Sequence, residues 1–259
     1  MKSNRAIIFA VSISMVFSFL YGVLTVRYKL FPFEQLKSVW QLVEADNAQL
    51  RKRVRKSNMK GKNYYKDKVS FFETLGGRDY DVVFVGDSLT DNAEWQDSFP
   101  SLRIANRGIS GDKTDGIGRR IESIYSTSAS TAFIMMGLND FLAGVEINKV
   151  FQNYKDVVNK LTHRKMTVYI QSTILTGSQK SSNAGLNNKI LALNERLRNF
   201  AKKTDSVFYV DLNAVLAPNL LLGEEFTRDG LHLNGDGYAK WNNLIQPYLV
   251  QYASINDRK

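Results

Sequence analysis

From residue 81 onward, short apolar runs alternate with helical patterns, and this alternation limits the fold more than any other feature. The runs are continuously apolar, as expected for strands that are covered on both faces. Strands are expected at 81–86, 102–105, 132–136, 167–171 and 207–211, and helices at 114–125, 146–162, 186–203 and 236–250. Strand–helix alternation of this kind predicts a parallel sheet between two layers of helices. The expected fold class is therefore α/β, a three-layer α/β/α sandwich with a five-stranded parallel sheet.

An apolar segment near the N-terminus predicts a membrane anchor. Residues 6–26 read AIIFAVSISMVFSFLYGVLTV, with no charge and no proline. As a helix rising 1.5 Å per residue, this segment would span a hydrocarbon core of roughly 30 Å. It is longer than the apolar stretch of a cleavable signal peptide, of about 7–15 residues, and lacks a convincing cleavage site. We therefore expect an uncleaved, single-pass signal anchor.

The charged residues that flank the apolar segment bear on the membrane topology of the chain. Lys2 and Arg5 precede the segment, and Arg27 and Lys29 follow it, so the positive-inside bias is nearly balanced. The basic residues at 51–56 favour a cytoplasmic location. A single N-terminal anchor with a basic start favours export, and we expect an extracytoplasmic catalytic domain, periplasmic or at the cell surface.

The segment between anchor and domain is expected to form a stalk. Apolar residues recur at three- and four-residue steps over 34–56, which predicts a helix that packs on the domain or on a partner, including a second copy. The block RKRVRK at 51–56 contributes to a net charge of +10. It suits either contact with anionic lipid or acidic glycan, or a solvated stalk, which we favour. No recognised nucleic-acid-binding motif accompanies it. The predicted domains are 1–29 (anchor), 30–76 (stalk) and 77–259 (catalytic domain).

Polar loops follow the first three expected strands. Ser88 comes directly after the first, Gly108 to Gly111 follow the second, and 137–140 follow the third. In open parallel sheets, ligands bind beyond the carboxyl ends of the strands. These loops are therefore expected to meet at one edge, with Ser88 as a candidate nucleophile.

A serine nucleophile needs a base, and the chain has two histidines and no cysteine. His163 ends a helix before a strand, where the opposite end of the sheet is expected. His232 lies in FTRDGLHLNGDG, three residues after Asp229. A tight loop can bring that carboxylate to one ring nitrogen while the other faces the serine.

Ester hydrolysis also needs donors for the developing oxyanion. The Ser88 N–H, a glycine N–H and an amide side chain would supply them. NRGISGDKT offers Gly108 and Gly111, and MMGLNDF offers Asn139. Neighbouring side chains are given structural roles: Asp87, Asp112 and Asp140 in bonding loop amides, and Trp95 and Phe141 in core packing rather than in lining the acyl side.

Four blocks in this order, GDSLT, NRGISGD, GLND and DGLH, resemble those of the SGNH hydrolases, also called GDSL esterases/lipases. RGISGDKT and DGLHLNGDGYAKW are most similar to the platelet-activating-factor acetylhydrolase-like branch. The resemblance covers about 81–250 and implies a flavodoxin-like sheet and a serine esterase without metal or cofactor. It implies a triad of Ser88, His232 and Asp229, with an oxyanion hole of the Ser88 and Gly111 N–H groups and the Asn139 amide. Gly111 is preferred to Gly108 as the second glycine of its block.

The expected function is a membrane-anchored serine esterase that hydrolyses short-chain acyl esters, including O-acetyl groups on envelope glycans. The same acyl-enzyme could instead pass its acyl group to a sugar hydroxyl. Lysophospholipase activity and a non-catalytic envelope scaffold are further alternatives. An intact triad argues against the scaffold, which has no need of these three residues together.

Overall fold

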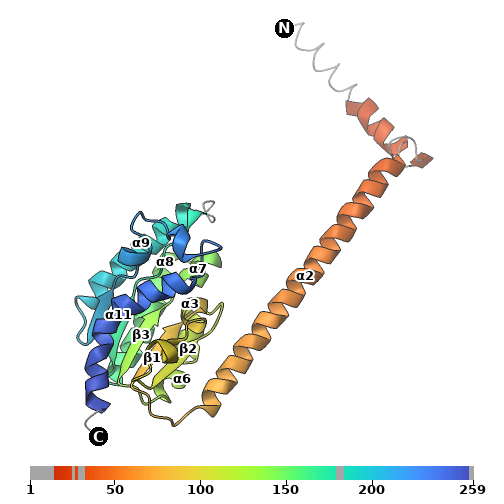
Figure 1. Cartoon of the computed structure of the whole chain (residues 1–259). Helices are drawn as coiled ribbons and strands as arrows, with labels where there is room; N and C mark the ends of the chain where they lie inside the picture. Colours follow the sequence, from red (N-terminus) through yellow and green to blue (C-terminus); the bar gives the residue numbers. More distant parts are fainter. Residues whose placement is uncertain (1–14, 25–26, 29–32, 179–183, 257–259) are drawn as a thin grey trace. The chain divides into compact units, whose positions relative to one another are not determined.

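The computed structural model describes residues 15–24, 27–28, 33–178 and 184–256. The chain divides into two compact units, Met1–Lys62 and Asn63–Lys259. In the first unit, residues 15–24 are helical and helix α2 (Phe33–Thr74) begins. The last turns of α2, residues 63–74, belong to the second unit, which contains the sheet (Figure 1).

The sheet has five parallel strands in the order β2-β1-β3-β4-β5, which confirms the predicted α/β class. The strands are β1 (Val82–Gly86), β2 (Ile104–Gly108), β3 (Thr131–Met135), β4 (Thr167–Gln171) and β5 (Val207–Val210). At the carboxyl end of the sheet, Gly86 lies in register with Gly108 on one side and Met135 on the other. The loops that follow β1, β2 and β3 therefore start at the same edge.

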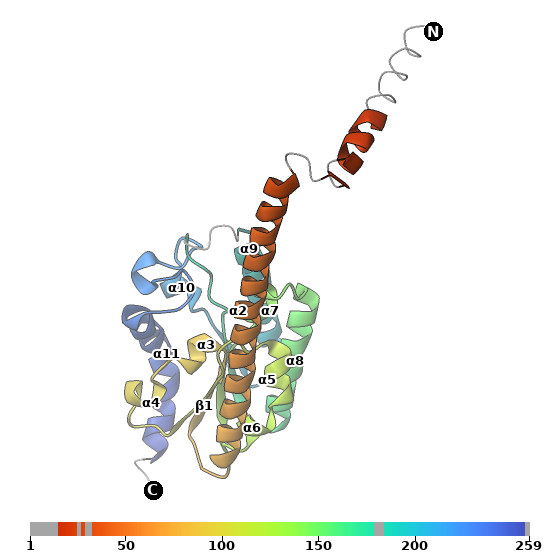
Figure 2. The same ribbon diagram turned by 90° about the vertical axis from the view of Figure 1, so that its right-hand side faces the viewer.

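Helices cover both faces of the sheet because successive strand side chains point to opposite sides. On one face, Val83, Val85 and their neighbours pack against α5 (Thr114–Arg119), α6 (Glu122–Tyr125), α8 (Ile147–His163) and α9 (Ala184–Ala201). On the other, Val82 and Phe84 pack against α4 (Trp95–Ser98), α10 (Asn213–Leu216) and α11 (Gly235–Asn256). Figures 1 and 2 show the strands between these two layers.

Several short helical elements were not expected from periodicity. They are α3 (Ser88–Asp91), α4, α7 (Leu138–Leu142), α10 and the 3-10 helix η2 (Glu224–Phe226). The helix expected at 114–125 is instead two helices, α5 and α6. Arg120 ends α5 outside helical geometry, at φ −103° and ψ 27°. The second strand lies at 104–108 rather than 102–105, so Gly108 is a strand residue. The end of this strand was not predicted because the polar residues Asn106 and Arg107 interrupt the apolar run.

Two predictions concern residues at the N-terminus. The anchor predicted at 6–26 lies largely outside the described residues. In the described ranges, no helix combines the length and apolar character required to cross a membrane. The stalk helix expected at 34–56 is part of the longer α2, which ends at Thr74.

Candidate active site

Ser88 is held at the carboxyl edge of the sheet by a tight turn. A Cβ on Gly86 would lie 2.1 Å from Thr90 Oγ1 and 2.5 Å from the Met135 carbonyl, so only glycine fits there. Asp87 caps α3: its Oδ1 accepts the Leu89 N–H at 3.1 Å. Ser88 is thus the first residue of a short helix that starts directly above β1.

His232 and Asp229 come from the loop between η2 and α11, and the structure brings both to Ser88. His232 Nε2 lies 3.2 Å from Ser88 Oγ, although 144 positions separate the two residues in the sequence. His232 Nδ1 lies 2.8 Å from Asp229 Oδ2. The three side chains therefore form a continuous line of two hydrogen bonds, hydroxyl to imidazole to carboxylate.

The Asp229 carboxylate is held ionised by its own loop. Its Oδ1 accepts the backbone N–H groups of Leu231 at 2.9 Å and His232 at 2.8 Å. Burial alone would raise the pKa of Asp229, but the hydrogen bonds from the His232 ring and from these two N–H groups lower it well below its usual range. The carboxylate can therefore fix the ring orientation at any ordinary assay pH.

Thr227, which sequence reasoning missed, closes this loop. Its hydroxyl donates to the His232 carbonyl at 2.6 Å and accepts the Gly230 N–H at 3.1 Å. Thr227 and Leu233 also form an isolated antiparallel bridge. The only indication of this role in the sequence is the presence of a threonine two residues before the DGLH block.

The two candidate glycines differ in what their N–H groups do. The Gly108 N–H donates to Asn106 Oδ1 at 2.8 Å, and a Cβ on Gly108 would lie 2.2 Å from the Asp91 nitrogen. Gly111 has a φ of +79° in an open turn. Among the described residues, neither its N–H nor that of Ser88 donates a hydrogen bond. Gly111 and Ser88 therefore present free backbone donors, whereas Gly108 does not.

Asn139, in the segment that follows β3, bonds residues from the loops after β1 and β2. It follows Gly137, whose φ of +113° turns the chain from β3 into α7. Its Nδ2 donates to the Asp112 carbonyl at 3.0 Å and contacts Asp87 Oδ2 at 3.3 Å. The Asn139 amide thus has two acceptors, and the contact to Asp87 is the longer of the two.

The three carboxylates beside the site bond loop amides, as the sequence predicted. Asp87 accepts from Leu89, Asp112 from the Lys113 N–H at 2.9 Å, and Asp140 from the Thr114 N–H at 2.9 Å. Burial raises the pKa of Asp87 to about 7, with Asp112 and Asp140 adding to the effect against the pull of Leu89 and His232.

The remaining candidates lie apart from this cluster. Trp95 and Phe141 are buried in the core, and Trp95 stacks on Phe84 with ring centroids 3.9 Å apart. His163 ends α8, exposed, with Nδ1 2.6 Å from the Asn159 carbonyl. Among the residues that the structure describes, no cluster of three His, Asp or Glu side chains could hold a metal ion.

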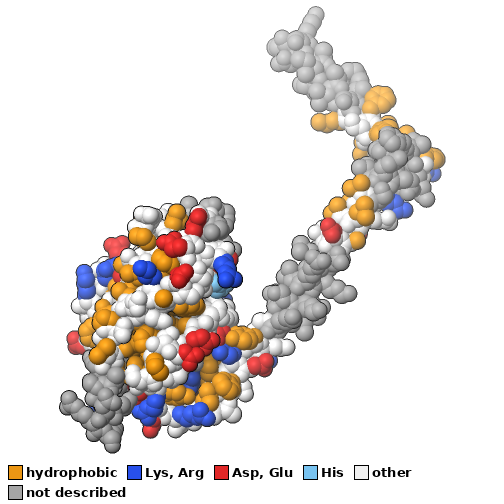
Figure 3. Space-filling model, in the orientation of Figure 1, with side chains coloured by type: hydrophobic (Ala, Val, Ile, Leu, Met, Phe, Trp, Pro, Cys, Tyr) orange, Lys and Arg blue, Asp and Glu red, His pale blue; other side chains and the backbone are white. Residues whose placement is uncertain are grey.

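One face of the second unit carries side chains of both charges (Figure 3). On the face drawn in Figure 3, acidic and basic side chains are interspersed with hydrophobic ones. Residues 63–259 contain 23 Lys or Arg and 22 Asp or Glu, so nearly all of the net charge of +10 comes from residues 1–62.

Residues 84–240 match the GDSL-like lipase/acylhydrolase family, and the chain belongs to that family. That family is one of lipases and acylhydrolases.

Similar solved structures share the fold. A protein from Streptococcus pneumonia proposed to be a platelet activating factor is 22% identical, with a TM-score of 0.67, over 79% of this chain and 99% of that one. A GDSL-like lipase from Bacteroides thetaiotaomicron is 24% identical, with a TM-score of 0.62, over 72% and 97%. An acetylxylan esterase from Geobacillus stearothermophilus is 17% identical, with a TM-score of 0.56, over 68% and 95%.

A curated relative, an N-acylneuraminate cytidylyltransferase from Streptococcus agalactiae, is 23% identical over 71% of this chain. This chain spans 41% of the length of that relative.

Proposed function

We propose that this chain hydrolyses short-chain acyl esters, including O-acetyl esters of glycans, with Ser88 as nucleophile, His232 as base and Asp229 as its partner. The observation that carries the proposal is the line of hydrogen bonds from Ser88 Oγ to His232 Nε2, 3.2 Å, and from His232 Nδ1 to Asp229 Oδ2, 2.8 Å. The acetylxylan esterase with the same fold is consistent with an acetylated sugar as substrate.

In this mechanism, Ser88 Oγ attacks the ester carbonyl carbon while its proton passes to His232 Nε2. The tetrahedral intermediate collapses, His232 gives the proton to the departing alcohol, and an acyl-serine remains. Water then attacks the acyl carbon, again losing its proton to His232. That proton returns to Ser88 Oγ as the carboxylic acid leaves, and the enzyme is restored.

The developing oxyanion is assigned to the Ser88 and Gly111 N–H groups and to the Asn139 amide. The free donors on Ser88 and Gly111 support this assignment. The Asn139 hydrogen that now contacts Asp87 at 3.3 Å would turn to the oxyanion. Loss of one such donor costs about 10²–10³ in rate.

The proposal includes a location. Residues 6–26 are assigned as an uncleaved signal anchor that holds the esterase domain on the extracytoplasmic side of a membrane. Its support is the uncharged twenty-one-residue stretch with basic residues before it. Protease accessibility of the domain in intact cells, compared with lysed cells, tests the location.

The test of function uses the full-length chain in a mild detergent. We expect hydrolysis of p-nitrophenyl acetate to exceed that of the octanoate, and release of acetate from acetylated xylan. Ser88→Ala is expected to lower kcat by at least about 10³-fold. Ser98→Ala is the matched control, because that exposed serine bonds only the Glu94 carbonyl and Asn242.

Equal rates for the wild type and Ser88→Ala would contradict the proposal. Preference for octanoate and lysophospholipid would replace the short-chain substrate with a lipid. Acyl transfer to added sugar in excess of hydrolysis would make the chain an acyltransferase at the same serine.

A further inference from the structure

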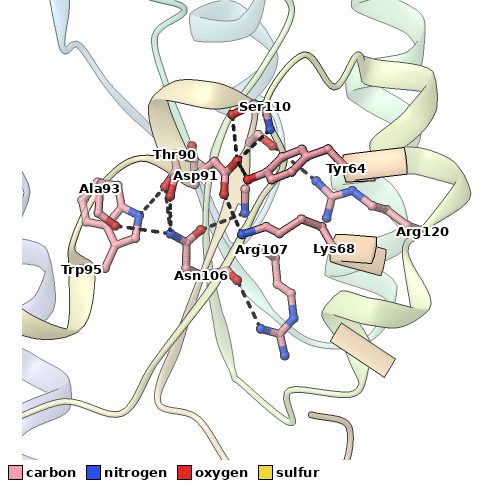
Figure 4. Close-up of polar contacts among 12 residues, drawn as sticks. Tyr64, Lys68, Thr90, Asp91, Ala93, Trp95, Asn106, Arg107, Ser110 and Arg120 are labelled. Atoms are coloured by element: carbon pink, nitrogen blue, oxygen red, sulfur yellow. Dashed lines mark hydrogen bonds and ion pairs between the residues drawn. The ribbon is translucent and has the colours of Figure 1, made fainter. Parts of the chain in front are cut away.

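The Asp91 carboxylate joins three segments of the second unit that are distant in sequence (Figure 4). Its Oδ2 accepts from the Ser110 N–H at 2.9 Å, from Ser110 Oγ at 2.8 Å and from Tyr64 Oη at 2.5 Å. Its Oδ1 pairs with Lys68 Nζ at 2.6 Å. Tyr64 and Lys68 belong to the last turns of α2, so this carboxylate links those turns to α3 and to the loop after β2.

Two of these segments contain the free backbone donors of the site. Asp91 is the last residue of α3, one turn after Ser88, and its own N–H donates to the Asp87 carbonyl at 2.8 Å. Ser110 directly precedes Gly111. One side chain therefore sets the distance between the helix that begins with Ser88 and the turn that presents the Gly111 N–H.

Backbone packing makes this linkage tight. Gly108 approaches α3 so closely that a Cβ there would lie 2.2 Å from the Asp91 nitrogen. Beside it, Asn106 Nδ2 donates to the carbonyls of Thr90 at 3.0 Å and Asp91 at 3.2 Å. A shift of the Asp91 carboxylate would thus be passed to both neighbouring segments, because close-packed groups do not deform independently.

The last turns of α2 supply a cation and a hydroxyl donor to the buried Asp91 carboxylate. The Asp91 side chain is only 3% exposed, and Lys68 is the cation paired with it. Burial raises the pKa of Asp91, but hydrogen bonds from Lys68, Tyr64 and Ser110 lower it below its usual value. Burial and the bond to Asp91 raise the pKa of Tyr64 to about 12, so its hydroxyl stays a donor.

These turns are themselves fixed to the domain. Phe72 is 1% exposed, and the Arg107 guanidinium lies 4.7 Å from its ring centroid. Residues 64, 68 and 72 follow one another at four-residue spacing and so lie on one face of α2. Along this face, Phe72 lies against the guanidinium groups of Arg107 and Arg120, and Tyr64 and Lys68 reach the Asp91 carboxylate.

We propose that Tyr64 and Lys68, acting through Asp91, are positioning residues that hold the oxyanion donors of Ser88 and Gly111 in register. The inference rests on the proposed function of Ser88. It makes the last turns of α2, which precede the family-matched region 84–240, a working part of the esterase.

The test compares Tyr64→Phe and Lys68→Met with Tyr65→Phe in the full-length chain. Tyr65 is the matched control because its hydroxyl donates to the Gly116 carbonyl at 3.3 Å rather than to Asp91. Misplacement of a reacting group by about 1 Å can cost 10²-fold, and loss of one of four contacts should cost less. We expect kcat for p-nitrophenyl acetate to fall about 3- to 30-fold in both variants, with KM changed less than about twofold.

A second measurement separates positioning from loss of folded enzyme. A short alkyl boronic acid forms a tetrahedral adduct with the serine, so its dissociation constant reports the oxyanion hole. We expect this constant to rise by about the same factor as kcat falls. Rates are expressed per active site, counted by stoichiometric phosphonate labelling, and Lys68→Arg is expected to restore most of kcat because it keeps the charge.

The inference is overturned if Tyr64→Phe matches Tyr65→Phe in kcat, or if kcat falls without any change in boronate affinity. Tyr64→Phe decides the matter alone if Lys68→Met does not fold. Ser88→Ala is measured in parallel. If it retains activity, the proposed function fails; if it is inactive while Tyr64→Phe behaves as the control, only the positioning role fails.

Discussion

Replacing Arg120 with methionine is expected to destabilise the domain by about 3–5 kcal/mol, the usual cost of breaking a buried ion pair on one side. Arg120 Nε lies 2.8 Å from Asp112 Oδ2, and the two side chains are 2% and 3% exposed. Arg120 Nη2 also donates to the Gly86 carbonyl at 3.3 Å. Methionine fills much of the same volume but leaves the Asp112 charge buried without its partner.

The size of the effect depends on pH, and its sign follows from Asp112. Burial raises the pKa of Asp112 above its ordinary value, against the opposing pull of Arg120. Removing Arg120 raises that pKa further. A carboxyl whose pKa is higher in the folded than in the unfolded protein lowers the free energy of unfolding as the pH rises above about 4. The loss is up to about 1.4 kcal/mol per pH unit and stops once the pH has passed the pKa of the carboxyl in the folded protein. The deficit of the variant should therefore be small near pH 4.5 and full at pH 8.

Thermal and urea unfolding of wild type and variant at both pH values measure this difference. At about 2–4 °C per kcal/mol for a domain of this size, the melting temperature should fall roughly 6–20 °C at pH 8. Arg119→Met is the control, since Arg119 is 67% exposed and pairs with Asp115 on the surface, where the effect should stay within about 0.5 kcal/mol. Equal deficits at the two pH values would refute the charge argument and leave only lost packing.

Two further predictions concern the loops of the site. Thr227→Val removes the hydroxyl that bonds the His232 carbonyl and the Gly230 N–H; we expect kcat/KM to fall about 10-fold and stability by about 1–2 kcal/mol. Thr162→Val, which removes a local bond to the Asn159 carbonyl in α8, serves as control, and equal activities would contradict a role for Thr227. Gly108→Ala places a Cβ against the Asp91 backbone and should cost about 3 kcal/mol or more. Gly111→Ala has open space and pays only for its left-handed φ, about 1–2 kcal/mol. Urea unfolding ranks the two, and a larger loss for Gly111→Ala would contradict this account.

Most of the sheet was predictable because β1, β3 and β4 are almost entirely buried and therefore read as apolar runs. The second strand was misplaced by two to three residues because it is an edge strand that contains Asn106 and Arg107. Those polar side chains have specific partners: Asn106 donates to carbonyls at the end of α3, and the Arg107 guanidinium stacks on the Phe72 ring. Polarity inside a strand conceals it when tertiary contacts satisfy the polar groups.

Ser88, Asp229 and His232 could be selected from the sequence because their motifs are local and their order is specific. Asp91, Tyr64 and Lys68 could not. Asp91 lies within a short helix with no periodicity, and the α2 residues that bond it are a tyrosine and a lysine, which do not register as an apolar stripe. The proposed role of these residues depends on a contact between Tyr64 and Asp91, which are 27 positions apart in the sequence. No short sequence motif predicts such a contact.

The distance between Ser88 and His232 along the chain has a consequence during synthesis. The hydroxyl leaves the ribosome 144 residues before the proposed base. At about 5–20 residues per second, that interval lasts roughly 7–30 s. Throughout it, the nascent polypeptide has a serine but no His232 to take its proton, so it cannot cleave esters until that histidine has been translated.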